Sequence, residues 1–323
     1  MSKKYDAAAI CSPLVDVTAN VGDELLSQLG LSKGSMHLIS EEESKAALAK
    51  LAGAPLVLSA GGSAANALAG VTGLGGSGLL IGVVADDDYG KLFANETESS
   101  GAETRFAVRG GATGRAITFI TPDGERTFAT HLGAAELLSP DDINEADIAS
   151  AAVLHLEGYL LENQYDACVK AMNAAKNAGS LVSLDLADGA LVKRISERMH
   201  STVEKFADIV LANEDEAAAF TGERDVRRAL TILGEACGFA VIKIGAEGSL
   251  IQTGGKVYET PAVKTEVVNT NGAGDMYAAG IIFGLARGFA PDVCGRLASA
   301  AAALVVSRAT ARLREQVRAE DLL

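Results

Sequence analysis

The sequence predicts an α/β protein with a mostly parallel central sheet, helices on both faces and a small β-sheet lid. Short apolar runs alternate with longer helical patterns through most of the 323 residues, and this alternation favours a parallel sheet between two helical layers. The stretch 103–130 differs, because it is strand-like throughout. We therefore expect one three-layer α/β/α domain over 1–323, with a lid inserted at about 13–40 and 103–131.

The elements follow from apolar periodicity and from turn residues. Strands are expected over a first apolar run at Ala7–Cys11 and then at Pro55–Ser59, Gly78–Val84, Ala152–Leu156, Leu181–Asp185, Asp208–Leu211 and Ala240–Ile244. Helices are expected at Ser63–Leu74, Gln164–Ala178, Ala190–Phe206 and Val226–Cys237. The lid strands are expected at Leu14–Val21, Ser35–Ile39, Arg115–Ile120 and Glu125–Thr130, with a hairpin turn at Thr121–Gly124.

Composition excludes several classes of function. The net charge is −14, so the chain repels nucleic acid and anionic membranes, and no block of Lys and Arg offsets this. No apolar run is long enough to cross a membrane. The apolar run after Lys3 and Lys4 is too short for a signal peptide. The four cysteines lie far apart without C-x-x-C spacing, which indicates thiols in a reducing cytoplasm.

The loop from Asn269 to Asp275, N-T-N-G-A-G-D, follows a predicted strand and opens a long helix. Gly272, Ala273 and Gly274 let a ligand approach the backbone, and the first free N–H groups of the helix can bind an anion. Phosphoryl transfer needs such donors, and Asp275 could accept a proton from an attacking hydroxyl. The same residues also suit an ordinary turn with an Asp that complements the helix dipole.

A second glycine-rich loop lies near the N-terminus. Gly61 and Gly62 follow a predicted strand, and Ser63 opens the helix that carries Asn66. Asn66 lies one helical turn beyond Gly62, so its amide can face a ligand against the glycines. An amide both donates and accepts, which suits vicinal hydroxyls. Small residues at this point are equally suited to tight packing of a helix on a strand.

The two loops together resemble the ribokinase (PfkB) family of carbohydrate and nucleoside kinases. The family carries G-G-x-x-x-N-x-A at the start of an early helix and D-T-x-G-A-G-D before a helix of small residues. Here these are Gly61–Ala67 and Asn269–Asp275, the latter followed by Met276–Gly280. The resemblance covers essentially the whole chain and implies a ribokinase-like fold, the lid included, and an ATP-dependent kinase with Asp275 as general base.

The resemblance also implies roles for other residues. Asp16 matches the acid that grips substrate hydroxyls, together with Gly61, Gly62 and Asn66. Glu216 matches the Glu that organises Mg²⁺, with Asn213 at the start of the same N-x-x-E element; without the family this would be a helix cap. The nucleotide-side turn is Gly245–Gly248. Lys243 stands where relatives more often carry Thr or Ser, and could contact ATP phosphates or pair with an acid.

Three further positions complete the expected site. Arg115 could reach the transferred phosphate when the lid closes, or be an exposed strand arginine. The helix around Arg296–Val305 is placed to pack on the adenine of ATP. Asn269 departs from the family's Asp and loses one negative charge, which could weaken metal organisation but leaves Asp275 untouched. We therefore expect an active enzyme that is slower than its relatives.

The substrate is expected to be a small nucleoside or sugar. Ser63, where ribokinase-like relatives commonly have Lys, and Tyr159, which could pack near a base, favour an adenosine kinase-like member. Leu14, Leu38 and Phe119 could add apolar surface from the lid. A sugar kinase for ribose, fructose or 2-keto-3-deoxygluconate stays open, as does a non-catalytic nucleotide- or sugar-binding protein. The expected cofactors are ATP and Mg²⁺, with K⁺ a candidate, and the protein is expected to be a monomer or homodimer.

Overall fold

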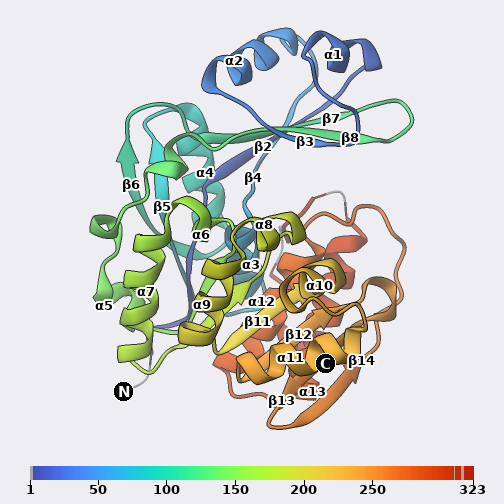
Figure 1. Ribbon diagram of the computed structural model, residues 1–323. Helices are drawn as coiled ribbons and strands as arrows, with labels where there is room; N and C mark the ends of the chain where they lie inside the picture. Colours follow the sequence, from blue (N-terminus) through green and yellow to red (C-terminus); the bar gives the residue numbers. More distant parts are fainter. Residues whose placement is uncertain (1–2, 309, 314–315) are drawn as a thin grey trace.

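A nine-stranded sheet forms the centre of the computed structural model, which describes residues 3–308, 310–313 and 316–323 (Figure 1). Seven adjacent strands are parallel to one another, and the two strands at one edge each pair antiparallel with the neighbour on their inner side. In spatial order they are β14 (Lys256–Thr260), β13 (Ser249–Thr253), β12 (Phe239–Lys243), β11 (Ile209–Asn213), β10 (Leu181–Asp185), β9 (Ala151–Glu157), β1 (Tyr5–Ile10), β5 (Gly78–Ala85) and β6 (Ala102–Arg109).

Helices cover both faces of this sheet and bury two separate aliphatic clusters. One face carries α3 (Ser63–Gly73), α4 (Asp88–Ser99), α12 (Ala273–Ala286) and α13 (Pro291–Val306). The other carries α5 (Glu145–Ala149), α6 (Leu160–Asn163), α7 (Tyr165–Asn177), α8 (Gly189–Arg194), α9 (Ser196–Phe206), α10 (Glu214–Thr221) and α11 (Val226–Ala236). Short 3-10 turns lie at Gly133–Leu137, Pro140–Asp142, Gly245–Glu247 and Ala319–Asp321. The predicted three-layer α/β/α arrangement is confirmed.

Helices α3 and α12 cross at very short range. A Cβ added to Gly70 of α3 would lie 2.5 Å from the Cβ of Ala279 and 2.7 Å from the sulfur of Met276, both on α12. Helices that meet through glycine and alanine bring their backbones close together. The two helices that begin at the predicted glycine-rich loops therefore lie side by side, and so do their first turns.

The second sheet, with helices α1 (Asp23–Gln28) and α2 (Glu41–Lys50), lies above the main domain (Figure 1), and we call this unit the lid. Its strand order is β3 (Met36–Leu38), β8 (Arg126–His131), β7 (Gly114–Ile120), β2 (Leu14–Asn20) and β4 (Val57–Ala60). The covered face carries Val15, Val17 and Phe119, which are fully buried in the cluster that includes α1 and α2 residues. The opposite, open face carries Asp16.

Two segments differ from the expected lid. Pro55–Ser59 was predicted as a buried main-sheet strand, but β4 pairs antiparallel with β2 at the edge of the lid, and Val57 is 57% exposed. The strand-like stretch from Glu103 was expected in the lid, but β6 pairs with β5 in the main sheet. A run of four or five mostly apolar residues does not show which sheet it joins, because it suits both a main-sheet strand buried on two faces and a lid strand buried on one.

The strand expected to end near Val268 does not form: β14 ends at Thr260, and irregular chain leads from there to α12. The other predicted elements lie where the periodicity placed them, with ends displaced by no more than two residues. The expected helix over Ala190–Phe206 is interrupted at Ile195, which separates α8 from α9. Within the described ranges, none of the helices combines the length and the apolar character that crossing a bilayer requires.

Candidate active site

The first turns of α3 and α12 meet through Asp275. Its carboxylate accepts a hydrogen bond from the Ser63 hydroxyl at 2.7 Å and one from the Asn66 amide nitrogen at 2.9 Å. Both predicted loops therefore contribute to one polar cluster, although they lie about 200 residues apart in the chain. A carboxylate has about four lone-pair positions, so Asp275 can still accept a hydrogen bond from a third group.

The loop before α12 has the form of an anion site. Gly272 is the N-cap residue with φ of 77°, a conformation that favours glycine, and an added Cβ would lie 2.5 Å from the carbonyl oxygen of Ala311. Ala273 and Gly274 are the first helical residues. The N–H of Ala273 donates to the carbonyl oxygen of Thr270 at 3.2 Å, so the N–H of Gly274 is the first that can bind an anion. The ammonium of Lys243 lies close by, 3.3 Å from the position of a Cβ added to Gly274.

A second carboxylate, Asp16, faces the same cluster from the open face of the lid. It packs directly against Gly61, where an added Cβ would lie 2.6 Å from the carboxylate oxygens. Arg312 closes this side: its Nη2 donates to the carbonyl oxygen of Gly61 at 3.0 Å and its Nε to the amide oxygen of Asn66 at 2.7 Å. Gly62 is the N-cap residue of α3.

Burial shifts the protonation equilibria of the acids in this cluster. Burial raises the pKa of Asp16 to about 6, with the Arg312 guanidinium acting in the opposite direction and the Asp275 carboxylate adding to the increase. Burial also raises the pKa of Asp275, against the hydrogen bonds from Ser63 and Asn66. Glu157, which accepts hydrogen bonds from the N–H groups of Ser12 and Ala64, has a pKa raised by burial to about 7. Raised pKa values in a polar pocket are typical of groups that handle protons.

A cleft of about 830 Å³ opens in front of Asp275. It is large enough for a nucleotide or a drug-sized ligand. The described residues that line it lie mostly at helix starts and just beyond the carboxyl ends of parallel strands; besides Asp275 they include Ser63, Tyr159, Asn213, Glu216, Lys243, Gly245, Gly248, Gly272, Ala273, Gly274 and Ala302. The predicted nucleotide-side residues other than Asn269 thus share one cleft with the proposed base, and Ala302 places α13 on its wall.

Two buried acids beside Lys243 fit a magnesium ion. Lys243 pairs with Asp185 at 2.9 Å, and burial and the Asp185 carboxylate raise the pKa of Glu216 to about 7. Glu216 and Asn213 form a capping box at the start of α10. The described residues hold no group of three or more metal-binding side chains, but Mg²⁺ usually keeps several waters and binds phosphates through one or two carboxylates. The donor set therefore suits Mg²⁺ held next to phosphates.

The lid contacts the anion loop through an arginine other than the predicted one. Arg126 on β8 donates to the side-chain oxygen of Asn269 at 3.0 Å, and that oxygen also accepts the backbone N–H of Asn271. Arg115 is in register with Val15 on the covered face and is buried, with its guanidinium 5.3 Å from the ring centre of Tyr89. The structure therefore does not bring Arg115 together with the Asp275 cluster.

Four residues of the site were not identified from the sequence: Arg126, Asp185, Glu157 and Arg312. Asp185 and Glu157 end parallel strands, where ligands bind in sheets of this kind. Their position in the sequence could therefore have marked them as candidate site residues. Arg126 follows the predicted hairpin turn, so the pairing register of the two hairpin strands could have shown which face of the lid it lies on. Arg312 lies in an irregular segment after α13, and no pattern around it indicates a site.

The fold and this arrangement define a class of protein: a ribokinase-like kinase, in which a buried carboxylate in the first turn of an anion-binding helix lines a nucleotide-sized cleft.

Comparison with known proteins identifies the family. The pfkB family carbohydrate kinase profile matches residues 29–316. Adenosine kinase from Saccharomyces cerevisiae is 29% identical over 300 residues, 86% of this chain and 87% of that protein. The 5-dehydro-2-deoxygluconokinase of Bacillus subtilis is 30% identical over 262 residues, 77% of this chain and 81% of that protein.

Solved structures agree over nearly the full length. An adenosine kinase from Sinorhizobium meliloti superimposes with a TM-score of 0.88 at 34% identity, covering 97% of each chain. A probable sugar kinase from Rhizobium etli CFN 42 gives 0.89 at 30% identity, covering 99% of this chain and 97% of that one. The chain belongs to the pfkB family of carbohydrate kinases. It is a phosphotransferase that acts on a hydroxyl group, and membership of this family implies use of ATP and Mg²⁺ in general.

Proposed function

We propose that this kinase transfers the γ-phosphoryl group of ATP to the 5′-hydroxyl of adenosine or a close analogue. The observation that carries the proposal is the apolar character of the open lid face around Asp16. Strand register places six large apolar side chains on this face: Leu14, Met36, Leu38, Val57, Ile120 and Phe128. Met36, Leu38 and Val57 are 57%, 64% and 57% exposed. A purine needs such a wall, whereas a free sugar does not.

The sugar part of the substrate has polar partners below this wall. Asp16 can bind ribose hydroxyls, and the second N–H of the Asn66 amide has no hydrogen-bond partner in the described part of the chain. Tyr159 lines the cleft and is 44% exposed, so it offers an aromatic surface. Phe119, in contrast, is fully buried on the covered face of the lid and cannot contact a ligand in the cleft.

We infer the following transfer step. The 5′-hydroxyl donates a hydrogen bond to Asp275, which takes the proton as the hydroxyl oxygen bonds to the γ-phosphorus and the bond to ADP breaks. The first N–H groups of α12 and the ammonium of Lys243 stabilise the charge on the phosphates. Asp185 and Glu216 would hold a magnesium ion, which neutralises part of the phosphate charge. Arg126 places a further cation from the lid next to the anion loop.

An acceptor screen tests the proposal. Purified protein with Mg·ATP is assayed for ADP release with adenosine, other nucleosides, ribose, fructose and 2-keto-3-deoxygluconate. We expect the highest kcat/KM with adenosine. Faster turnover of a sugar would make the protein a sugar kinase, and the identity with the deoxygluconokinase supports keeping that candidate. ATP binding without turnover of any acceptor would indicate a non-catalytic binding protein.

A lid variant separates the two kinase candidates. Leu38→Ser should raise the KM for adenosine by about tenfold, as expected for removing one large apolar contact, and leave the KM for ATP unchanged. Val108→Ser is the matched control, because Val108 is similarly exposed at 58% but lies on β6 of the main sheet. Equal effects of the two variants would remove the argument for a nucleobase site on the lid.

Four general properties are part of the proposal. The chain is treated as one domain with an inserted lid. A cytoplasmic location is supported by four cysteines that are all free and buried. K⁺ is proposed as an activator on the family resemblance alone, and rates in Na⁺ and K⁺ buffers test it. The lid edges β3 and β4 could pair with a second copy, so light scattering distinguishes the monomer from the homodimer.

A further inference from the structure

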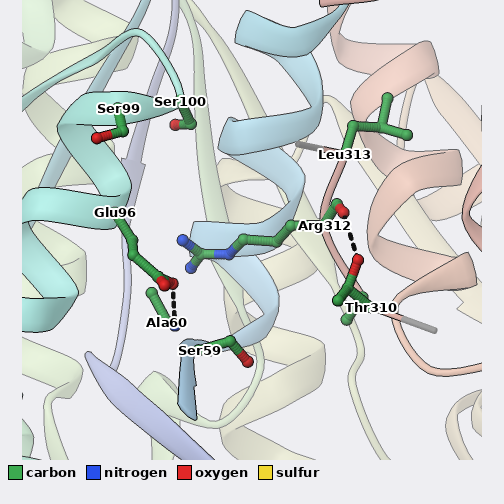
Figure 2. Close-up of a pocket in the computed structure, with 9 residues that line it drawn as sticks. Ser59, Ala60, Glu96, Ser99, Ser100, Thr310, Arg312 and Leu313 are labelled. Atoms are coloured by element: carbon green, nitrogen blue, oxygen red, sulfur yellow. Dashed lines mark hydrogen bonds between the residues drawn. The ribbon is translucent and has the colours of Figure 1, made fainter. Parts of the chain in front are cut away.

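Arg312 reaches the substrate side of the site from the segment that follows α13. Its guanidinium points from this segment toward Glu96 and Ala60, across a cavity of about 200 Å³ (Figure 2). Two of its nitrogens donate to the loop that carries the first family motif, at the Gly61 carbonyl and the Asn66 amide oxygen. The C-terminal segment thus contributes directly to a cluster otherwise built from β2, α3 and α12.

The contact with Asn66 fixes which end of the amide faces which neighbour. A guanidinium can only donate hydrogen bonds, so the amide oxygen of Asn66 must face Arg312. The amide nitrogen then faces Asp275, to which it donates at 2.9 Å. If the amide were rotated by 180°, its NH₂ group would oppose the guanidinium and its oxygen would oppose the carboxylate. Arg312, which can only donate, and the Asp275 carboxylate, which can only accept, therefore fix the orientation of the Asn66 amide from its two ends.

Stability alone does not account for an arginine here. Its third nitrogen, Nη1, is buried and has no hydrogen-bond partner among the residues that the structure describes. Burying an unpaired donor is unfavourable, and each such group in a native structure calls for an explanation. The aromatic ring of Phe93, 5.7 Å from the guanidinium carbon, is the other feature that favours a cation at this point.

We propose that Arg312 is a positioning residue for phosphoryl transfer, which acts by orienting the Asn66 amide toward Asp275 and the acceptor hydroxyls. The inference rests on the proposed function and adds to it a residue outside both family motifs. Its charge has a second effect, on Asp16. The charged groups that act on Asp16 are Arg312, which lowers its pKa, and Asp275, which raises it. Arg312 thus keeps Asp16 ionised at a lower pH than burial alone would allow.

A double-mutant cycle tests the positioning role. Arg312→Met should lower kcat/KM for the acceptor by about 10- to 100-fold, the range expected when hydrogen bonds from a charged group are lost. In the Asn66→Ala background the same change should alter kcat/KM by less than about threefold, because the target of Arg312 is already absent. Arg318→Met, an exposed arginine of the same segment, is the matched control and should match the wild type. Effects of Arg312 and Asn66 that simply multiply would overturn the proposal.

The pH dependence supplies a readout that a purely structural role would not change. Without Arg312 the pKa of Asp16 rises, so the acidic limb of the kcat/KM profile should move to higher pH in Arg312→Met. Arg312→Lys keeps the charge, and it should keep the limb in place while restoring only part of the rate. A reduced melting temperature with an unmoved limb would mean that Arg312 only stabilises the fold.

Titration of the Asp16 carboxyl by carbon NMR, without any ligand, separates this inference from the proposed function. If the wild type phosphorylates no acceptor, the proposed function fails, but the Asp16 titration still decides whether Arg312 acts on the site. If the wild type is active and the Asp16 pKa is the same in wild type and Arg312→Met, the electrostatic part of the inference is wrong while the kinase assignment stands.

Discussion

Replacing Asp275 with Asn tests the assignment of the general base with little disturbance of the structure. In the wild type, Ser63 and Asn66 each donate one hydrogen bond to the carboxylate. An Asn at this position can keep both: its oxygen accepts from the Asn66 nitrogen, and its NH₂ group donates to the Ser63 hydroxyl, which rotates to accept. The change therefore removes a buried charge and leaves the packing intact, so the melting temperature should stay the same or rise.

The chemical loss should nevertheless be large. General base catalysis contributes about 10²- to 10⁴-fold, so kcat should fall by that factor, or by about 3–5 kcal/mol in barrier height at 1.36 kcal/mol per tenfold change. The KM for ATP should stay within about twofold, because the proposed phosphate contacts are with the start of α12 and with Lys243 rather than with this carboxylate. Burial raises the pKa of Asp275, and the base must be ionised. Wild-type kcat should therefore decline as the pH falls through a pKa above the ordinary value of about 3.9.

A coupled assay of ADP release under saturating ATP and acceptor measures the effect, and denaturant unfolding shows that the variant is folded. Asp275→Ala serves for comparison, because it leaves the Ser63 hydroxyl and the Asn66 amide unpaired and should also destabilise the fold by about 1–3 kcal/mol. If Asp275→Asn kept more than a tenth of wild-type kcat, another group would have to be the base.

Three further predictions concern the neighbouring loops. Asn269→Asp should preserve or raise kcat, because it restores the carboxylate that the family carries at this position, and a more than tenfold loss would show that the amide has a specific role. Lys243→Met should lower the free energy of unfolding by about 3–5 kcal/mol, since it leaves a buried acid unpaired. Lys176→Met is the control: it breaks an ion pair whose side chains are 40% and 28% exposed, so it should cost less than about 1 kcal/mol. Similar losses of unfolding free energy for the two variants in urea would contradict this. Gly272→Ala should lose more stability and activity than Gly288→Ala. Gly288 has a similar φ of 73° but open space around it, so its replacement by Ala should cost only about 1 kcal/mol. Equal melting temperatures of the two variants would show that the loop at Gly272 relaxes.

The two glycine-rich loops could be predicted because each combines small residues with a helix start within a few positions; a strand ends directly before the first loop only, since β14 ends at Thr260, well before the second. Their approach in space could not be derived from periodicity, since it depends on how α3 and α12 pack. The resemblance to a family supplied that information for Asn66 and Asp275. For Arg312, neither periodicity nor the family resemblance predicted a role, because the residue lies in irregular chain and its contacts are with residues far away in the sequence.

For the two lid arginines, Arg115 and Arg126, the sequence did contain the information that tells them apart. Arg115 has the same two-residue phase as Ile117 and Phe119, both fully buried, so alternation places it on the covered face. Arg126 is in register with Ile120 and belongs to the opposite phase. Both are strand arginines beside a turn, and only the pairing register tells them apart. In a lid whose open face is itself apolar, hydrophobicity does not indicate which phase faces the ligand.

The close crossing of α3 and α12 at Gly70 sets a limit on how this enzyme can evolve. The residues proposed to hold the acceptor and the residue proposed to remove its proton stand at the beginnings of two helices joined by a glycine–alanine contact. A larger side chain at Gly70 would push the helices apart and separate Ser63 and Asn66 from Asp275, however well each loop was preserved. New acceptor specificities are therefore more accessible through substitutions on the open face of the lid, where side chains can change size without altering that spacing.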